Sequence, residues 1–131
     1  GIEIEVVREP NDGYWKNVWL KKPWGACYWG GRPTEDWMFS TTHYSGADWN
    51  DTHFKNEQFD KWLIEARAET NQNKRRQLYY EMQKMVSDEG GTVVPMFANF
   101  VFAAHKNVQH GTMAGNWMMD GNKFHERWWF A

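Results

Sequence analysis

The sequence contains one cysteine, Cys27, and four prolines among its 131 residues. A single cysteine excludes an intrachain disulfide, and with it a small fold stapled by disulfides. No apolar run approaches the roughly 20 residues that a membrane-spanning helix needs. Neither sign of charge dominates, because 15 Lys and Arg face 17 Asp and Glu. That balance argues against a protein that binds nucleic acid through bulk positive charge.

Aromatic side chains are abundant instead. Ten Trp, eight Phe and five Tyr make up 18% of the chain, and seven Met add adaptable apolar surface. The length suits one domain, and one core of that size does not need so many large rings. We therefore expect some of them to line a groove or an interface, and we expect the chain to self-associate through exposed apolar surface.

The N-terminal part predicts a strand, a helix and a second strand. Residues 2–8 alternate apolar and charged side chains, which is typical of a half-buried strand. A turn at 10–13 begins a helix whose spacing places Trp15 and Trp19 in the core. Residues 25–29 then form a short buried strand, in which Cys27 is a small core residue. This order predicts a βαβ unit with parallel strands.

Two helices are predicted in the middle of the chain. Asn56 is a good N-cap, and an apolar stripe at helical spacing follows it. Asn71 begins a second amphipathic helix, which Gly90-Gly91 ends through a left-handed residue. The two helices form a predicted αα-hairpin.

The remaining segments give weaker patterns. A short helix is expected at 37–39, and strands are expected at 92–97 and 99–104. Residues 105–131 show no clear periodicity.

Several motifs along the chain resemble one protein family. They are Asn56-Glu57-Gln58-Phe59-Asp60, Ala66-Arg67, Leu78-Tyr79-x-Glu81-Met82-Gln83, Val93-Val94-Pro95, Tyr28-Trp29-Gly30-Gly31-Arg32-Pro33-Thr34 and Glu126-Arg127-Trp128-Trp129-Phe130. Their order is similar to that of the C-terminal part of extracytoplasmic solute-binding proteins, family 5, of peptide/nickel/opine ABC transporters. The resemblance implies an α/β fold, with a mixed sheet flanked by helices, from a two-lobed periplasmic-binding-protein-like architecture. The whole of 1–131 would be a single partial domain, with about 1–95 in the second lobe and about 96–131 returning to the first.

The resemblance also implies a function. Such a protein captures a peptide-like or opine-like solute between its lobes in the periplasm and delivers it to a membrane ABC permease. No acid–base or nucleophile constellation occurs in the sequence, so we do not expect an enzyme. Neither a cofactor nor a nucleic-acid partner is expected.

The predicted ligand site centres on Trp29-Gly30-Gly31-Arg32. This segment lies where a predicted strand ends, which is where open α/β sheets bind ligands. Two glycines allow a close backbone approach, and the Arg32 guanidinium suits a carboxylate or phosphate. Members of the family that bind peptides commonly have Asp near this position, so Arg32 favours an anionic ligand group. The alternative is a structural Arg32 that pairs with Glu35 or Asp36.

Three more tryptophans are candidate ligand contacts. Trp24 and Trp37 flank the glycine segment, and Trp49 lies in a loop from which it packs either on the ligand or on the core. The same rings leave two other functions open: a carbohydrate or sugar-phosphate site on Trp platforms, and a Trp-rich protein-interaction module. His43 and His53 lack the spacing of metal ligands, so no metal site is expected.

Overall fold

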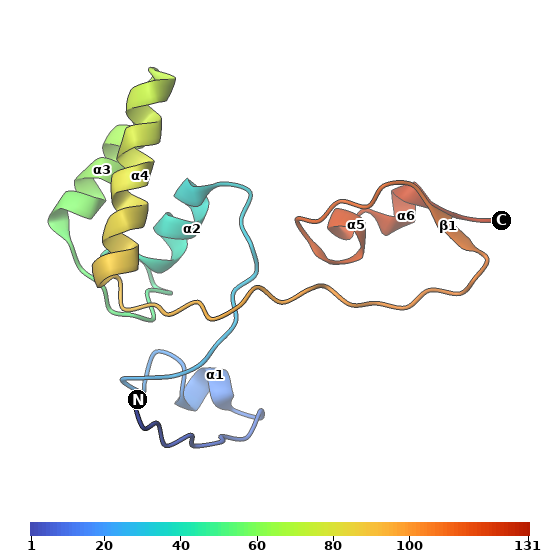
Figure 1. The fold of residues 1–131 in the computed structure, drawn as a ribbon, viewed down its shortest axis with the longest axis horizontal. Coiled ribbons are helices and arrows are strands. Elements are labelled where there is room, and N and C mark those ends of the chain that lie inside the picture. The colour runs from blue at the N-terminus through green and yellow to red at the C-terminus, as the bar shows by residue number, and fades with distance from the viewer.

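A computed structural model describes all residues, 1–131. In Figure 1 the helices of residues 35–89 form a group at one end and a small C-terminal unit lies at the other, while the N-terminal segment lies below and extended chain joins these parts. The elements, in chain order, are α1 (Tyr14–Asn17), α2 (Glu35–Thr42), α3 (Glu57–Ala68), α4 (Gln72–Glu89), β1 (Val108–His110), α5 (Met118–Asn122), α6 (Phe124–Arg127) and β2 (Trp128–Phe130). The chain thus combines helices with one short sheet and is broadly α/β.

The predicted αα-hairpin of α3 and α4 is confirmed. The Asn56 side chain accepts hydrogen bonds from the amides of Gln58 and Phe59, at 2.9 and 3.1 Å. Asn71 caps α4 in the same way. After α4, Gly91 takes a φ of +71°, the left-handed conformation that ends the helix. Local capping and helical periodicity therefore specify both helices, which pack against each other.

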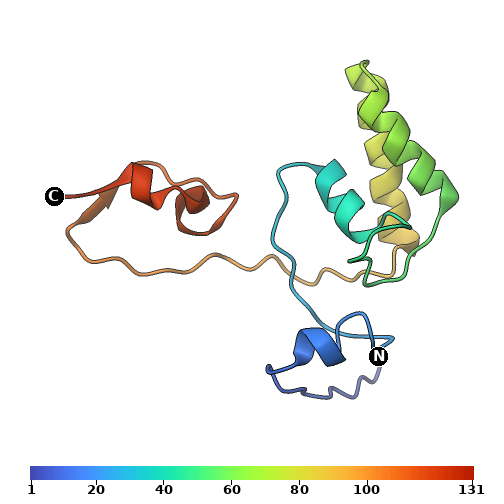
Figure 2. The ribbon, with the colours of Figure 1, turned by 180° about the vertical axis from the view of Figure 1, so that it is seen from behind.

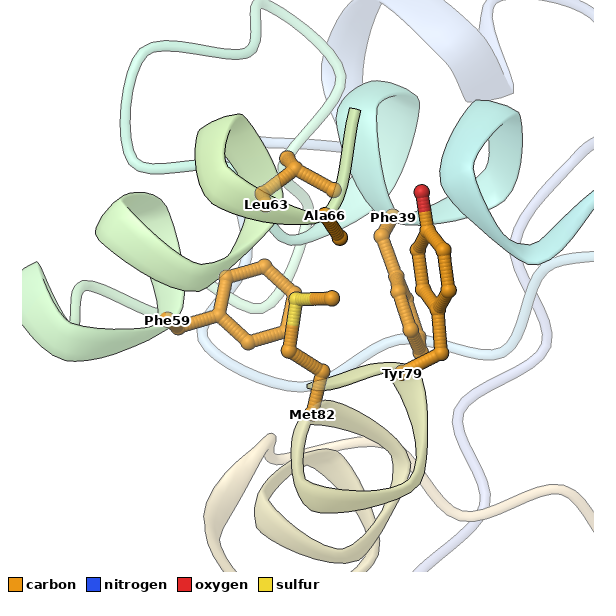
Figure 3. Packing of buried hydrophobic residues seen from close by; sticks show 6 residues of the cluster. All are labelled: Phe39, Phe59, Leu63, Ala66, Tyr79 and Met82. Carbon is orange, nitrogen blue, oxygen red and sulfur yellow. The ribbon is translucent and has the colours of Figure 1, made fainter. Parts of the chain in front are cut away.

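Three helices supply the hydrophobic core that Figure 3 shows. α2 is longer than the predicted 37–39, because the Thr34 hydroxyl accepts from the Trp37 amide and caps it from Glu35 onward. Its Phe39 ring packs edge-on against Phe59 of α3, with centroids 5.3 Å apart. The buried cluster consists of Phe39, Phe59, Leu63, Ala66, Tyr79 and Met82. This is a small core for a chain of this length.

A polar network joins the same three helices at one edge of the core. Asp36 of α2 accepts two hydrogen bonds from the Arg67 guanidinium of α3, at 2.9 and 3.1 Å, and one from the Tyr79 hydroxyl of α4, at 3.0 Å. Burial alone would raise the pKa of Asp36, but these donors outweigh it and the pKa is lowered. Burial and the neighbouring carboxylate raise the pKa of Tyr79 to about 12. The network fixes α2 against the hairpin.

His43, which follows α2, is buried among aromatic rings. Its side chain is 7% exposed and contacts Phe39, Phe54 and Phe59. Its Nδ1 lies 2.6 Å from the Thr42 hydroxyl oxygen. Burial lowers the pKa of His43 below 6.5, although the negative charge of Asp51 opposes part of the shift. The folded protein therefore holds this imidazole neutral at a pH where an exposed histidine begins to charge.

We expect the free energy of unfolding to fall as the pH drops below about 6.5. In that range unfolded His43 binds a proton that folded His43 resists, so acid favours the unfolded state. Stability is complete above pH 6.5 and decreases towards the lowered folded pKa. Melting by circular dichroism between pH 7.5 and 5.5 should show a decrease in Tm of a few degrees, outside the acid range where Asp36 titrates.

The control for this pH dependence is His53→Asn. His53 is exposed and has a φ of +54°, which asparagine tolerates, so this variant should keep the slope. His43→Leu should remove it. A Tm that stays constant from pH 7.5 to 5.5 in the unmodified chain contradicts the assignment.

The predicted strands are extended but unpaired, so the βαβ prediction is wrong for this structure. Residues 1–10, 23–33 and 91–104 make no backbone–backbone hydrogen bonds. Both ribbon views show 91–104 as a long strap between α4 and the C-terminal unit (Figures 1 and 2). Phe97 on this strap is 93% exposed. Alternating side chains favour a strand only where a neighbouring strand completes the ladder, and none lies beside these segments.

The single sheet lies instead in 105–131, where no period was detected. β1 and β2 pair antiparallel, with Gln109 opposite Trp129. Strands of three residues are too short to show alternation, which explains why the sequence did not reveal them. Buried Asp120 holds this unit together by accepting from the Ala114 amide, Arg127 and Trp128, and the Ala114 hydrogen bond is the main cause of its lowered pKa.

Candidate functional site

The Arg32 guanidinium lies between two indole rings. Its central carbon is 6.0 Å from the Trp29 ring centroid and 5.7 Å from that of Trp37. Its Nη1 donates to the Gly30 carbonyl at 2.7 Å. Trp37 lies in the first turn of α2, which the Thr34 cap begins next to Arg32. The structure thus brings three predicted site residues together as a cation between aromatic faces.

No carboxylate neutralises this cation. The structure contains no ion pair of Arg32, and the oxygens of Asp36 are bound by Arg67 and Tyr79 instead. The alternative, in which Arg32 pairs with Glu35 or Asp36, is therefore wrong. The Nε atom of Arg32 is buried and has no hydrogen-bond partner. A buried donor without an acceptor is unusual in folded proteins and points to a missing acceptor.

Asp51 fixes the orientation of the Trp29 ring. One of its oxygens accepts from the indole nitrogens of Trp29, at 3.2 Å, and Trp19, at 2.9 Å. The rings of Trp19, Trp29 and Trp49 lie 6.1 to 6.2 Å from one another. Trp49 therefore packs on Trp19 and Trp29, which lie outside the hydrophobic core, and its contact with a ligand stays a prediction. The sequence analysis missed Asp51, because a carboxylate in a polar loop gives no signal of its indole partners.

Cys27 also donates to Asp51, at 3.3 Å. The residue as a whole is exposed, so its prediction as a core residue is wrong. The sulfur itself lies against Asp51, and partial burial, together with that carboxylate, raises the pKa of the thiol to about 11. It stays protonated at neutral pH and is a poor nucleophile.

Two of the other predicted site residues, Trp24 and Gly31, take no part in the contacts that surround the Arg32 guanidinium. Trp24 is 76% exposed and contacts no other aromatic ring. Gly31 has open space beside its backbone, so nothing approaches it closely. Trp15, expected in the core, is also half exposed and packs edge-on against Tyr28. Their segment is extended and unpaired, which removes the strand that would have carried Trp24 to the site.

Trp117 reaches the site from the C-terminal unit. A side-chain carbon placed on Gly30 would lie 3.9 Å from the Trp117 ring and 3.6 Å from the Arg32 Nη1 atom. Trp117 and the Arg32 Nη1 atom therefore both border the space beside Gly30. Trp117 directly precedes α5, in a stretch without periodicity. Its residue type is therefore the one signal in the sequence that could have indicated it as a site residue.

The structure brings together no group of three His, Cys, Asp or Glu side chains able to hold a metal ion. No helix combines the length and apolar character required to cross a bilayer. No protein-family model, no curated protein and no solved structure matches this chain. Inferences about function therefore depend on the geometry around Arg32 and on the motifs of the sequence.

Proposed function

We propose that this chain forms part of one lobe of an extracytoplasmic solute-binding protein, family 5, and that Arg32 binds an anionic group of the solute. The observation that carries this proposal is the Arg32 guanidinium, which lies between Trp29 and Trp37 without a carboxylate partner. Planar guanidinium groups bind carboxylates with two parallel hydrogen bonds. The Nε of Arg32 has no hydrogen-bond partner within the chain.

A peptide-like or opine-like solute fits this chemistry because it carries a carboxylate. In the proposed protein, residues 1–95 belong to the second lobe and residues 96–131 return to the first. Closure of the two lobes on the solute shifts the population towards a closed form that an ABC permease in the membrane recognises. The protein acts in the periplasm, and it carries its solute without changing it chemically.

The two other functions fit the arrangement of rings less well. Sugar platforms need an open aromatic face, whereas the Trp29 and Trp37 rings border the Arg32 guanidinium. A Trp-rich interaction module would present a flat, continuous aromatic surface. The Trp19 ring is instead inclined at 62° to that of Trp29 and at 69° to that of Trp49.

The test is Arg32→Ala in the longer protein that this proposal implies. Calorimetry of the solute found by thermal-shift screening of peptides, opines and oligosaccharides should show a loss of about 2 kcal/mol, or roughly thirtyfold in affinity. The loss follows because a charge-assisted pair is removed.

Trp24→Ala is the matched control, because Trp24 is predicted in the same site but is exposed, and the rings that contact Arg32 are Trp29 and Trp37. Its affinity should equal that of the unmodified protein. An Arg32→Ala protein that binds its solute with unchanged affinity refutes the role of Arg32.

A further inference from the structure

A pocket of about 300 Å³ with mostly hydrophobic lining residues lies between the strap 91–104 and residues 113–120. Phe100 and Phe102 contribute from the strap, Met113 and Trp117 from the loop before α5, and Met119 from α5 itself. Asp120 is the charged residue of the lining, but its oxygens accept from the Ala114 amide, Arg127 and Trp128. Seven of the ten lining residues are hydrophobic, so the pocket offers a ligand hydrocarbon and aromatic surface beside polar surface that includes Asn99.

Trp117 connects this pocket to Arg32. Its indole ring lines the pocket and also borders the space beside Gly30, where the Arg32 Nη1 atom lies. A cationic group and an apolar pocket therefore meet at one aromatic ring. The two come from segments far apart in the chain, since Arg32 precedes α2 and the pocket follows α4.

We infer that the ligand is an amphipathic anion, whose carboxylate binds Arg32 and whose apolar arm fills the pocket beside Trp117. This inference rests on the proposed function, because it takes Arg32 as the anion site. A carboxylate on a partly exposed arginine binds weakly by itself, so an apolar arm must supply much of the affinity. The pocket volume of about 300 Å³ is at the lower end of the range for ligand pockets. A single ring or a short hydrocarbon chain is therefore the favoured apolar arm of the ligand.

Three probes separate the two parts of the ligand. They are 3-phenylpropionate, which has carboxylate and arm, 3-phenylpropionamide, which has the arm alone, and acetate, which has the carboxylate alone. Saturation-transfer difference NMR with this chain at micromolar concentration measures each Kd. We expect millimolar binding of 3-phenylpropionate, at least about tenfold tighter than either of the others. Burial of two methylene groups already gives that factor over acetate, and the charge-assisted pair with Arg32 gives it over the amide.

Two variants fill the pocket while leaving Arg32 in place. Ala98 is exposed at the rim, and a side chain at Gly115 would meet no atom within 4 Å, so Ala98→Trp and Gly115→Leu should both fold. Either variant should bind 3-phenylpropionate only as weakly as the unmodified chain binds acetate. If acetate and 3-phenylpropionate bind equally in the unmodified chain, and both bind through Arg32, the apolar arm is refuted and the proposed function stands. If Arg32→Ala leaves every probe unaffected, both are refuted.

Discussion

Phe59→Ala is expected to abolish the helical structure of the chain at 25 °C. Phe59 is fully buried and packs edge-on against Phe39 and Phe54. Removing a buried phenyl ring costs about 3–5 kcal/mol, through lost burial and the cavity that remains. The helical group spans only residues 34–90, and cores of that size rarely provide more than about 3–5 kcal/mol in total. The substitution therefore costs about as much free energy as the helical group gains on folding.

Ile64→Ala is the matched control on the same helix. Ile64 is 60% exposed and points away from the core, so its loss should change the free energy of unfolding by no more than about 0.5 kcal/mol. Far-UV circular dichroism and thermal melts measure both variants. A cooperative melt of Phe59→Ala close to that of the unmodified chain would show that Phe59 does not carry the core.

The helical hairpin could be predicted because its determinants are local. Asn56 and Asn71 each cap the helix that follows, and Gly91 ends the second through its left-handed backbone. The apolar stripe that Phe59 and Leu63 begin has the helical period, and both side chains are buried. Such signals are contained in a few consecutive residues and need no distant partner.

Strand pairing is a different case, because it depends on residues far away in the sequence. The alternation at 2–8 matches a half-buried strand, yet Ile2 is 91% exposed and the segment pairs with nothing. β1 and β2 do pair, although their three-residue strands carry no readable period. The pattern of a strand indicates what it would bury, and only the rest of the fold decides whether a neighbour is present.

The candidate site was predictable in its centre but not in its surroundings. Residue type and position indicated Arg32, Trp29 and Trp37, which the structure brings together. Asp51 completes the site from the loop between α2 and α3, and Trp117 completes it from the C-terminal unit, where neither spacing nor periodicity relates them to Arg32. The contact of Trp117 depends on the path of the strap 91–104, which no local pattern specifies.

The chain exposes more surface than a compact monomer of its mass. Its accessible surface is 10858 Å², whereas a compact monomer of 15.6 kDa exposes roughly 7,300 Å². The excess of about 3,600 Å² on one chain is several times the roughly 800 Å² that each partner buries in a standard protein–protein interface. The unpaired segments 1–10 and 91–104 carry much of its apolar part, including Ile2, Phe97 and Val101.

We therefore expect this chain to form a dimer or a larger assembly at micromolar concentration. Unpaired backbone on the strap 91–104 invites a strand from a second copy, and the exposed side chains of Phe97 and Val101 gain by burial. Exchange of the 96–131 segment between copies is one way to build such an assembly. Light scattering across a concentration series should give a mass of at least twice 15.6 kDa.

Two substitutions on the strap test where the copies meet. Val101→Lys places a charge at an exposed apolar position of the strap and should shift the mass towards the monomer, because charged residues on an edge oppose strand pairing. Ile64→Lys, at an exposed position of α3 away from the strap, is the matched control and should leave the assembly intact. A monomeric mass at every concentration of the unmodified chain would mean that the exposed rings and the unpaired strap are stable in water without a partner.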